Sequence, residues 1–381
     1  MFRLLLALLV MCQHYFADLA PQALADAAAP FAFGGIAVLV FFALSGFVIS
    51  EAIDCIYRGR AKAFLENRLL RIVPHFILAL ALSMLAHALF REVGGLRLWR
   101  SQPDFPDDAF APTNVVLNFV GIVPLADRTM SYNFLDITWA LRVEMAFYLL
   151  AAFCILAARS RSYARVAGCM ALGLTPLFVA ALAGRGIGMT AFGFLPYFVY
   201  GSALYFALNG RGRAWSVALI CIPMMLFHCW WAPAVNPASG AAPPSLVGNV
   251  AMLVALLAIM TALAGVTLQQ RKTLDRYLGD LTYPLYLYHE IILVVVLTFS
   301  ATYSYTLLFA AMGISLGFAA LMGAIVDPVI ELYRDRVRGM RLIFTESHPG
   351  VGAIGAHQRS GRPARSEIGR ASCRERVSPY V

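Results

Sequence analysis

Ten apolar segments dominate this sequence and limit what it can fold into. They fall at about 4–20, 31–54, 72–90, 134–158, 163–183, 189–208, 214–231, 245–266, 281–300 and 303–326. A helix of roughly 20 apolar residues is long enough to cross a bilayer. Of all residues 60% are hydrophobic and only 13% are charged, whereas soluble domains carry about 25% charged residues. We therefore expect an all-α polytopic membrane protein, a bundle of about ten transmembrane helices.

The charges between these segments predict how the bundle is oriented. Every gap after an even-numbered segment is basic, as with Arg58, Arg60 and Lys62 after the second, whereas the gaps after odd-numbered segments are neutral or mixed. Because Lys and Arg concentrate in cytoplasmic loops, we expect both termini to be cytoplasmic. The formal net charge of +9 is then a matter of topology, and we expect no nucleic-acid partner.

The same pattern predicts the domain organisation. We expect one transmembrane domain over residues 1–335 and a polar, disordered cytoplasmic tail over residues 336–367. The stretch 368–377 matches a translated sequencing adapter codon by codon, so we expect residues 368–381 to be an artefact. Several prolines and an acidic cluster in 91–133 favour an irregular external cap.

Three ionisable residues lie inside the expected spans at similar depths. Ten residues separate Arg3 from His14, so a rise of about 1.5 Å per residue carries His14 roughly 16 Å from a cytoplasmic Arg3, to mid-depth. Glu144 and His289 fall near that level when counted from the ends of their own spans. Isolated charges are costly in lipid, so we expect these side chains to face one another or a water-filled cavity. A His–Glu pair suits general-base catalysis, but a structural polar cluster or a transporter's proton relay fits the same pattern.

Other candidates lie at span ends or share a helix face. Arg68 and Arg71 are three residues apart, and two guanidinium groups on one face suit a phosphate. On these residues alone, the basic flank of an ordinary membrane helix is the simpler interpretation. Tyr286 and His289 also share a face, which suits either a substrate pocket or a core hydrogen bond. Gly35 and the Ser45-Gly46 pair in the second span favour close helix packing rather than chemistry.

Five stretches of the sequence, in this order, carry a resemblance to a known family. The first is the Arg-x10-His pair formed by Arg3 and His14, and the second is the run 35–49, which begins with Gly and contains Phe-Phe-Ala-Leu-Ser-Gly-Phe. The third is Arg-x-x-Arg-x-x-Pro at 68–74. The fourth, 138–148, contains Trp, Glu and a final Phe-Tyr, and the fifth, 278–289, begins with Leu-Gly and ends with Tyr-Leu-Tyr-His. The chain resembles the integral-membrane acyltransferase family 3, which includes O-antigen and nodulation-factor acyltransferases. The resemblance extends over about residues 3–330.

The resemblance implies an O-acyltransferase, commonly an acetyltransferase, of the inner (cytoplasmic) membrane. Its donor would be cytoplasmic acyl-CoA, and its acceptor a hydroxyl of a glycan or lipid-linked saccharide, as in polysaccharide modification of the cell envelope. The residues that it implies are catalytic His14 and Glu144, acyl-CoA-binding Arg3, Arg68 and Arg71, and substrate-binding Trp139, Tyr286 and His289.

Two alternatives remain open at this point. A proton-coupled transporter of a small anionic or acylated substrate could use His14 and Glu144 as a relay, although no internal repeat is evident. Trp139 suits an interfacial anchor as well as a pocket wall. No cluster of residues has the spacing of zinc ligands, so we expect no metal and no permanently bound cofactor, with acyl-CoA as a substrate only.

Overall fold

The computed structural model describes residues 1–98, 105–124, 130–158, 193–231, 245–267, 278–300 and 303–338, together with Gly168. All regular structure in these ranges is helical, and they contain no strand. The helices are α1 (Phe2–Asp18), α2 (Gln22–Ala28), α3 (Phe33–Cys55), α4 (Ala61–Glu92), α5 (Pro112–Phe119), α6 (Thr138–Ala157), α8 (Leu195–Leu208), α9 (Ala214–Trp231), α10 (Leu246–Thr267), α12 (Thr282–Phe299) and α13 (Tyr305–Arg338).

Six of these helices are long and apolar enough to cross a membrane: α3, α4, α6, α10, α12 and α13. Helices α8 and α9 are apolar but shorter. Of the ten expected segments, only 163–183 lies outside the described residues, apart from Gly168. The all-helical class is confirmed, whereas the count of ten spans and the cytoplasmic position of both termini remain predictions.

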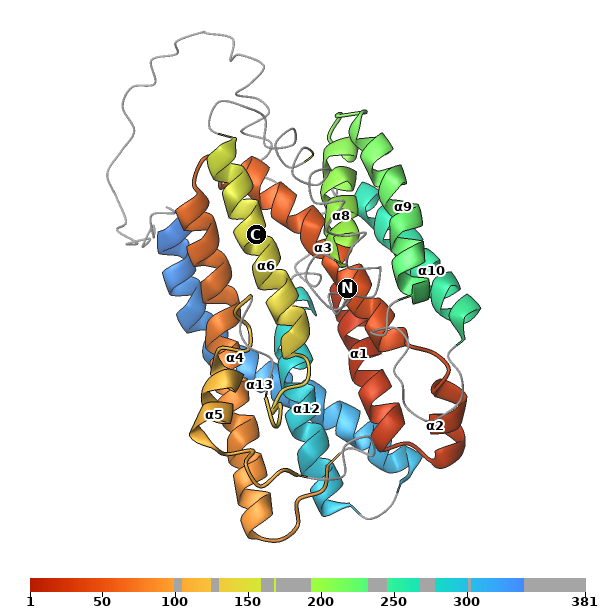
Figure 1. The fold of residues 1–381 in the computed structure, drawn as a ribbon, viewed down its shortest axis with the longest axis vertical. Helices are drawn as coiled ribbons and strands as arrows, with labels where there is room; N and C mark the ends of the chain where they lie inside the picture. Colours follow the sequence, from red (N-terminus) through yellow and green to blue (C-terminus); the bar gives the residue numbers. More distant parts are fainter. Residues whose placement is uncertain are drawn as a thin grey trace, which may run out of the picture.

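Helices α3 and α12 form the centre of the bundle. The most apolar part of each is 72% buried, whereas that of α10 or α13 is 28% buried. Helix α1 packs against both central helices. Figure 1 shows α8, α9 and α10 standing together on one side, with α4 and the C-terminal end of α13 on the other. The helices that line the site described below are therefore the innermost ones and their direct neighbours.

Helices α3 and α8 approach each other most closely at two glycines. A Cβ on Gly46 would lie 2.8 Å from Cα of Phe198, and a Cβ on Gly201 would lie 2.8 Å from the carbonyl carbon of Ala43. Ordinary van der Waals contact needs 3.4–4 Å. The backbones can therefore meet only because neither position carries a side chain, which is the packing role expected for Gly46.

Helix α4 begins earlier than the sequence indicates. The expected span starts at residue 72, after a basic loop, but the helix starts at Ala61 and continues through Pro74. A turn at Gly59, with φ of +72°, separates it from α3. Pro74 has no N–H, so the carbonyl oxygen of Leu70, four residues earlier, loses its helical hydrogen bond. The Tyr283 hydroxyl of α12 donates to the carbonyl oxygen of Ile72 at 2.9 Å, which ties the turn that contains Pro74 to α12. Arg68 therefore lies within a packed helix.

The expected cap and tail are described only in part. Within 91–133, the short helix α5 is tied to the chain after it, because the amide groups of Asn114 and Asn118 both donate to the carbonyl oxygen of Tyr132. Helix α13 continues to Arg338, three residues past the expected domain end at 335. The stretch from 339 to 381, with most of the expected tail and the adapter-like segment, lies outside the described residues.

Candidate active site

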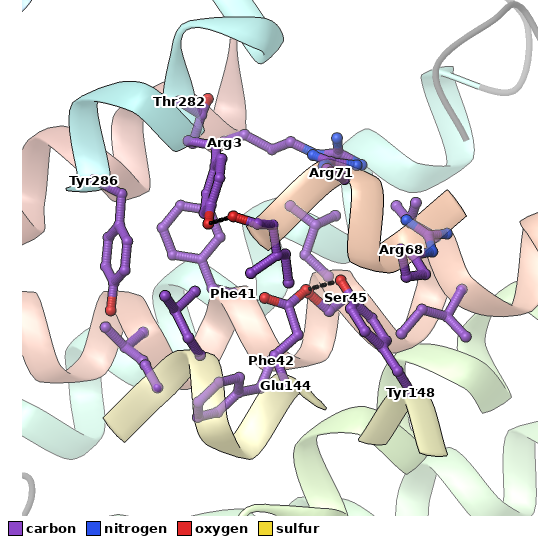
Figure 2. Close-up of a pocket in the computed structure, with 18 residues that line it drawn as sticks. Arg3, Phe41, Phe42, Ser45, Arg68, Arg71, Glu144, Tyr148, Thr282 and Tyr286 are labelled. Atoms are coloured by element: carbon purple, nitrogen blue, oxygen red, sulfur yellow. Dashed lines mark hydrogen bonds between the residues drawn. The ribbon is translucent and has the colours of Figure 1, made fainter. Parts of the chain in front are cut away.

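A pocket lies between α1, α3, α4, α6 and α12, and we call it the arginine pocket (Figure 2). Its polar lining consists of Arg3, Ser45, Arg68, Arg71, Glu144, Tyr148, Thr282, Tyr283 and Tyr286. Its apolar lining includes Phe41, Phe42, Leu44, Val48, Ile49 and Leu141. Three guanidinium groups and one carboxylate thus face a cavity whose remaining walls are largely apolar.

Arg68 is a buried cation in this pocket with hydrogen-bonding capacity to spare. It is 2% exposed, and its Nε and Nη2 have no hydrogen-bond partner among the described residues. Its Cζ lies 5.6 Å from the ring centroids of both Phe64 and Tyr148. The ring faces stabilise the charge but accept no hydrogen bond in the plane of the guanidinium group. Arg68 is thus not a solvated helix flank, and its free donors suit an anion.

Glu144 belongs to the arginine pocket. The Tyr148 hydroxyl, one turn along α6, donates to its Oε1 at 2.5 Å, and the Ser45 hydroxyl donates to the same oxygen at 3.3 Å (Figure 2). The expected partnership of Glu144 with His14 is not among these contacts, and His14 does not line this pocket.

The position of α1 explains why Glu144 and His14 are separate. Figure 1 shows the N-terminus, where α1 begins, near mid-height of the bundle and not at one of its ends. Glu144, also inside the bundle, therefore shares a pocket with Arg3. A rise of about 1.5 Å per residue carries His14 roughly 16 Å beyond this level, toward the start of α6.

His14 instead meets His289 and Glu290 of α12, and we call these three residues the histidine cluster. The ring centroids of His14 and His289 are 5.3 Å apart. One ligand atom from each of the three residues lies within 4.8 Å of the other two. His289 and Glu290 are almost completely buried, whereas His14 is half-buried and remains accessible.

Hydrogen bonds to three elements hold the cluster in place. Nδ1 of His289 lies 3.1 Å from the carbonyl oxygen of Leu285, one turn earlier in α12. The Tyr15 hydroxyl of α1 donates to the carbonyl oxygen of His289 at 2.9 Å. Oε2 of Glu290 accepts the backbone N–H of Asp136, just before α6, at 3.0 Å. The cluster therefore ties α1, α12 and the start of α6 together.

Tyr286 connects the two parts of the site. It lines the arginine pocket, and its ring centroid lies 6.4 Å from those of Phe41 and His289. The shared face expected for Tyr286 and His289 is thus present. Trp139 stands one layer back, with its ring 6.2 Å from that of Phe42, which lines the pocket.

Comparison with known proteins decides the family. Residues 1–326 match the model of acyltransferase family 3, which is described as an acyltransferase domain. The chain belongs to this family. No curated protein and no solved structure matches it. The match and the apolar helices together make it a membrane protein of an acyltransferase family.

In the acyltransferase, the expected site residues lie in two adjoining groups. Arg3, Arg68 and Arg71 come together with Glu144, whereas His14 comes together with His289. Sequence reasoning missed two further residues. Glu290 was overlooked although it is an acidic residue in the middle of an apolar span, which is itself a functional signal. Ser45 was assigned to packing with Gly46, but Gly46 makes the close contact and Ser45 faces the pocket.

Proposed function

We propose that this protein is an O-acyltransferase that moves an acyl group, acetyl in the simplest case, from acyl-CoA to a carbohydrate hydroxyl. It would act at the inner membrane, with cytoplasmic acyl-CoA as donor and a glycan or lipid-linked saccharide of the cell envelope as acceptor. The observation that carries the proposal is the position of a cationic pocket beside a histidine pair. Both include residues of α1 and α12, and Tyr286 lies between them.

The arginine pocket suits the donor on two grounds. CoA carries several phosphate groups, and planar guanidinium groups bind phosphate through paired hydrogen bonds. Arg68 offers buried N–H groups without a partner among the described residues, and Arg3 and Arg71 add two further positive charges. The apolar walls at Phe41 and Phe42 suit the uncharged arm that carries the thioester.

His14 would be the base of the transfer. An unprotonated His14 nitrogen takes the proton of the acceptor hydroxyl as the hydroxyl oxygen attacks the thioester carbonyl carbon. The C–O bond forms, the C–S bond breaks, and His14 returns the proton to the departing sulfur as free CoA thiol. The imidazole suits this exchange because it can take up and release a proton near neutral pH.

Glu144 would act on the donor, acyl-CoA, and would not assist His14. Its carboxylate lies in a pocket with three arginines and is held by Tyr148 and Ser45. A fixed negative charge there limits the positive field of the pocket, which helps the product CoA to leave. Trp139 would support the pocket wall through Phe42.

The first experiment follows label from acetyl-CoA into cell-surface glycan in cells that produce the protein. His14→Ala should reduce transfer about 100-fold or more, because general-base catalysis contributes roughly 10²- to 10⁴-fold. Cys12→Ala, on the same helix and also partly exposed, is the control and should transfer at the normal rate. A folded, membrane-inserted His14→Ala protein with normal transfer would refute the proposal.

A second experiment tests the donor site by itself. Binding of acetyl-CoA to the purified protein should weaken at least 10-fold in the double variant Arg68→Ala/Arg71→Ala, because charge-assisted hydrogen bonds to phosphate are lost. Arg336→Ala, at an exposed site where α13 ends, is the matched control. Equal affinity in the double variant and the control would remove the phosphate-binding role.

A further inference from the structure

Two acceptor atoms in the histidine cluster are buried without a donor. His289 Nε2 and Glu290 Oε1 have no hydrogen-bond partner among the described residues, although the two residues are only 1% and 2% exposed. Buried polar atoms in proteins are almost always hydrogen-bonded. A pair of unsatisfied acceptors beside His14 therefore needs a physical explanation.

The tautomer of His289 follows from the surroundings of its other nitrogen. Nδ1 lies 3.1 Å from the carbonyl oxygen of Leu285, which can only accept a hydrogen bond. In the neutral ring, Nδ1 therefore carries the hydrogen and Nε2 carries a lone pair. The nearby His14 ring is the one neighbour in the cluster that can present an N–H to this lone pair.

Glu290 has one oxygen engaged by the backbone and one left over. Oε2 accepts the N–H of Asp136 at 3.0 Å, immediately before α6. That bond fixes the backbone one residue before the N-cap of α6, Ile137. Since the Glu290 carboxylate reaches within 4.8 Å of both imidazoles, its second oxygen is available to His14 and His289.

We propose that Glu290 and His289 are positioning residues for the base His14, and that the three side chains share protons as one unit; this rests on the function proposed above. One His14 nitrogen takes the acceptor's proton, while the N–H on its other nitrogen donates to the free lone pair of His289 or Glu290. The carboxylate balances the charge of the imidazolium until the proton passes to the leaving sulfur. The shared protons remain in hydrogen bonds, and the only covalent bonds that change are those of the transfer and the N–H bond that His14 forms and then gives up.

The other ionisable groups around the cluster are less suited to this role. Asp136 lies beside Glu290, but its side chain is exposed, and water weakens the attraction of such a carboxylate for His14. The Tyr15 hydroxyl already donates to a backbone carbonyl. Tyr286 is neutral and lines the arginine pocket. Glu290 is the buried carboxylate of the cluster, and water weakens an attraction less at a buried site.

A divalent transition metal would also satisfy these lone pairs, since two histidines and a glutamate form a common zinc ligand set. A metal on the free nitrogen of His14 would prevent that nitrogen from accepting a proton. The shared-proton arrangement leaves His14 able to act as the base, and bound metal is therefore one of the outcomes that the experiment distinguishes.

The test uses the full-length protein purified in detergent, radiolabelled acetyl-CoA, and envelope glycan from the cells that make the protein. Glu290→Gln keeps an acceptor for the N–H of Asp136 but removes the charge. We expect kcat to fall about 10- to 100-fold, a part of the general-base contribution, with the KM for acetyl-CoA within about twofold. Glu290→Asp should recover part of kcat. Asp327→Asn is the matched control, since Asp327 pairs with His75 at 2.9 Å elsewhere in the bundle, and it should keep kcat.

Two further variants separate the possible outcomes. In a His14→Ala background, Glu290→Gln should add no further loss, because residues that act as a unit are not additive. If Glu290→Gln does not fold, His289→Gln should show the same loss of kcat. Unchanged kcat in the folded variants, an additive double variant, or one equivalent of zinc that Glu290→Gln removes would each overturn the proposal. Full activity of His14→Ala would instead refute the proposed function.

Discussion

Replacing Gly46 by alanine should damage both the stability and the donor site of this protein. The added Cβ would lie 2.8 Å from Cα and from the carbonyl carbon of Phe198, and nearer still to its carbonyl oxygen, whereas ordinary contact needs 3.4–4 Å. Helix α8 must therefore move away by at least about 0.6 Å, measured from the two carbon contacts. Overpacking of this kind costs about 1–3 kcal/mol.

The displacement should also affect the arginine pocket, because Ser45 and Phe42, which lie near Gly46 on α3, line that pocket. We expect thermal unfolding in detergent to begin several degrees lower, and the KM for acetyl-CoA to rise several-fold. The control is Gly317→Ala on α13, where a Cβ would meet nothing within 4 Å. If Gly46→Ala unfolds at the same temperature as Gly317→Ala and keeps its KM, the close-contact argument is wrong.

Three other predictions test single contacts. Arg68→Lys keeps the charge but loses the planar fork, so the KM for acetyl-CoA should rise about 10-fold in steady-state kinetics with kcat little changed; an unchanged KM would contradict this. Glu144→Gln keeps an acceptor for Tyr148 but adds net positive charge to the pocket, so calorimetry should show acetyl-CoA binding about two- to tenfold tighter, and weaker binding would count against the assigned role. Arg334→Met removes the hydrogen bond from Nε of Arg334 in α13 to Oδ1 of Asn67 in α4, at 3.0 Å. Thermal unfolding should show a stability lower by about 1–3 kcal/mol, with the KM for acetyl-CoA unchanged. A higher KM would link this contact to the pocket.

Much of the fold could be predicted because apolar length and periodicity are local properties. Most helices that correspond to the expected segments start and end within several residues of the predicted positions. The large exceptions are the end of α13, twelve residues beyond the expected 326, and the start of α4. Its early start could not be predicted because Pro74 and the basic residues before it are typical of a helix end. The contact that holds the turn beside Pro74 comes from Tyr283, more than two hundred residues away.

The site was harder to predict because depth depends on where each helix starts within the bundle. Counting residues from the membrane end of each expected span placed Glu144 at the same depth as His14. Helix α1 instead starts near mid-height of the bundle (Figure 1), and Glu144 shares a pocket with Arg3. A one-dimensional rise also cannot show which way a side chain points. It therefore gave no reason to choose Glu290, the residue beside His289, as a carboxylate that meets His14.

Helix α1 also fixes the angular relation between the two halves of the site. Arg3 and His14 lie on one unbroken helix from Phe2 to Asp18. At 3.6 residues per turn, eleven steps bring the chain about 20° past three full turns, so both side chains leave the helix on nearly the same side. One inserted residue would swing His14 about 100° away from the direction set by Arg3. The ten residues between them can exchange one apolar side chain for another, but they cannot change in number.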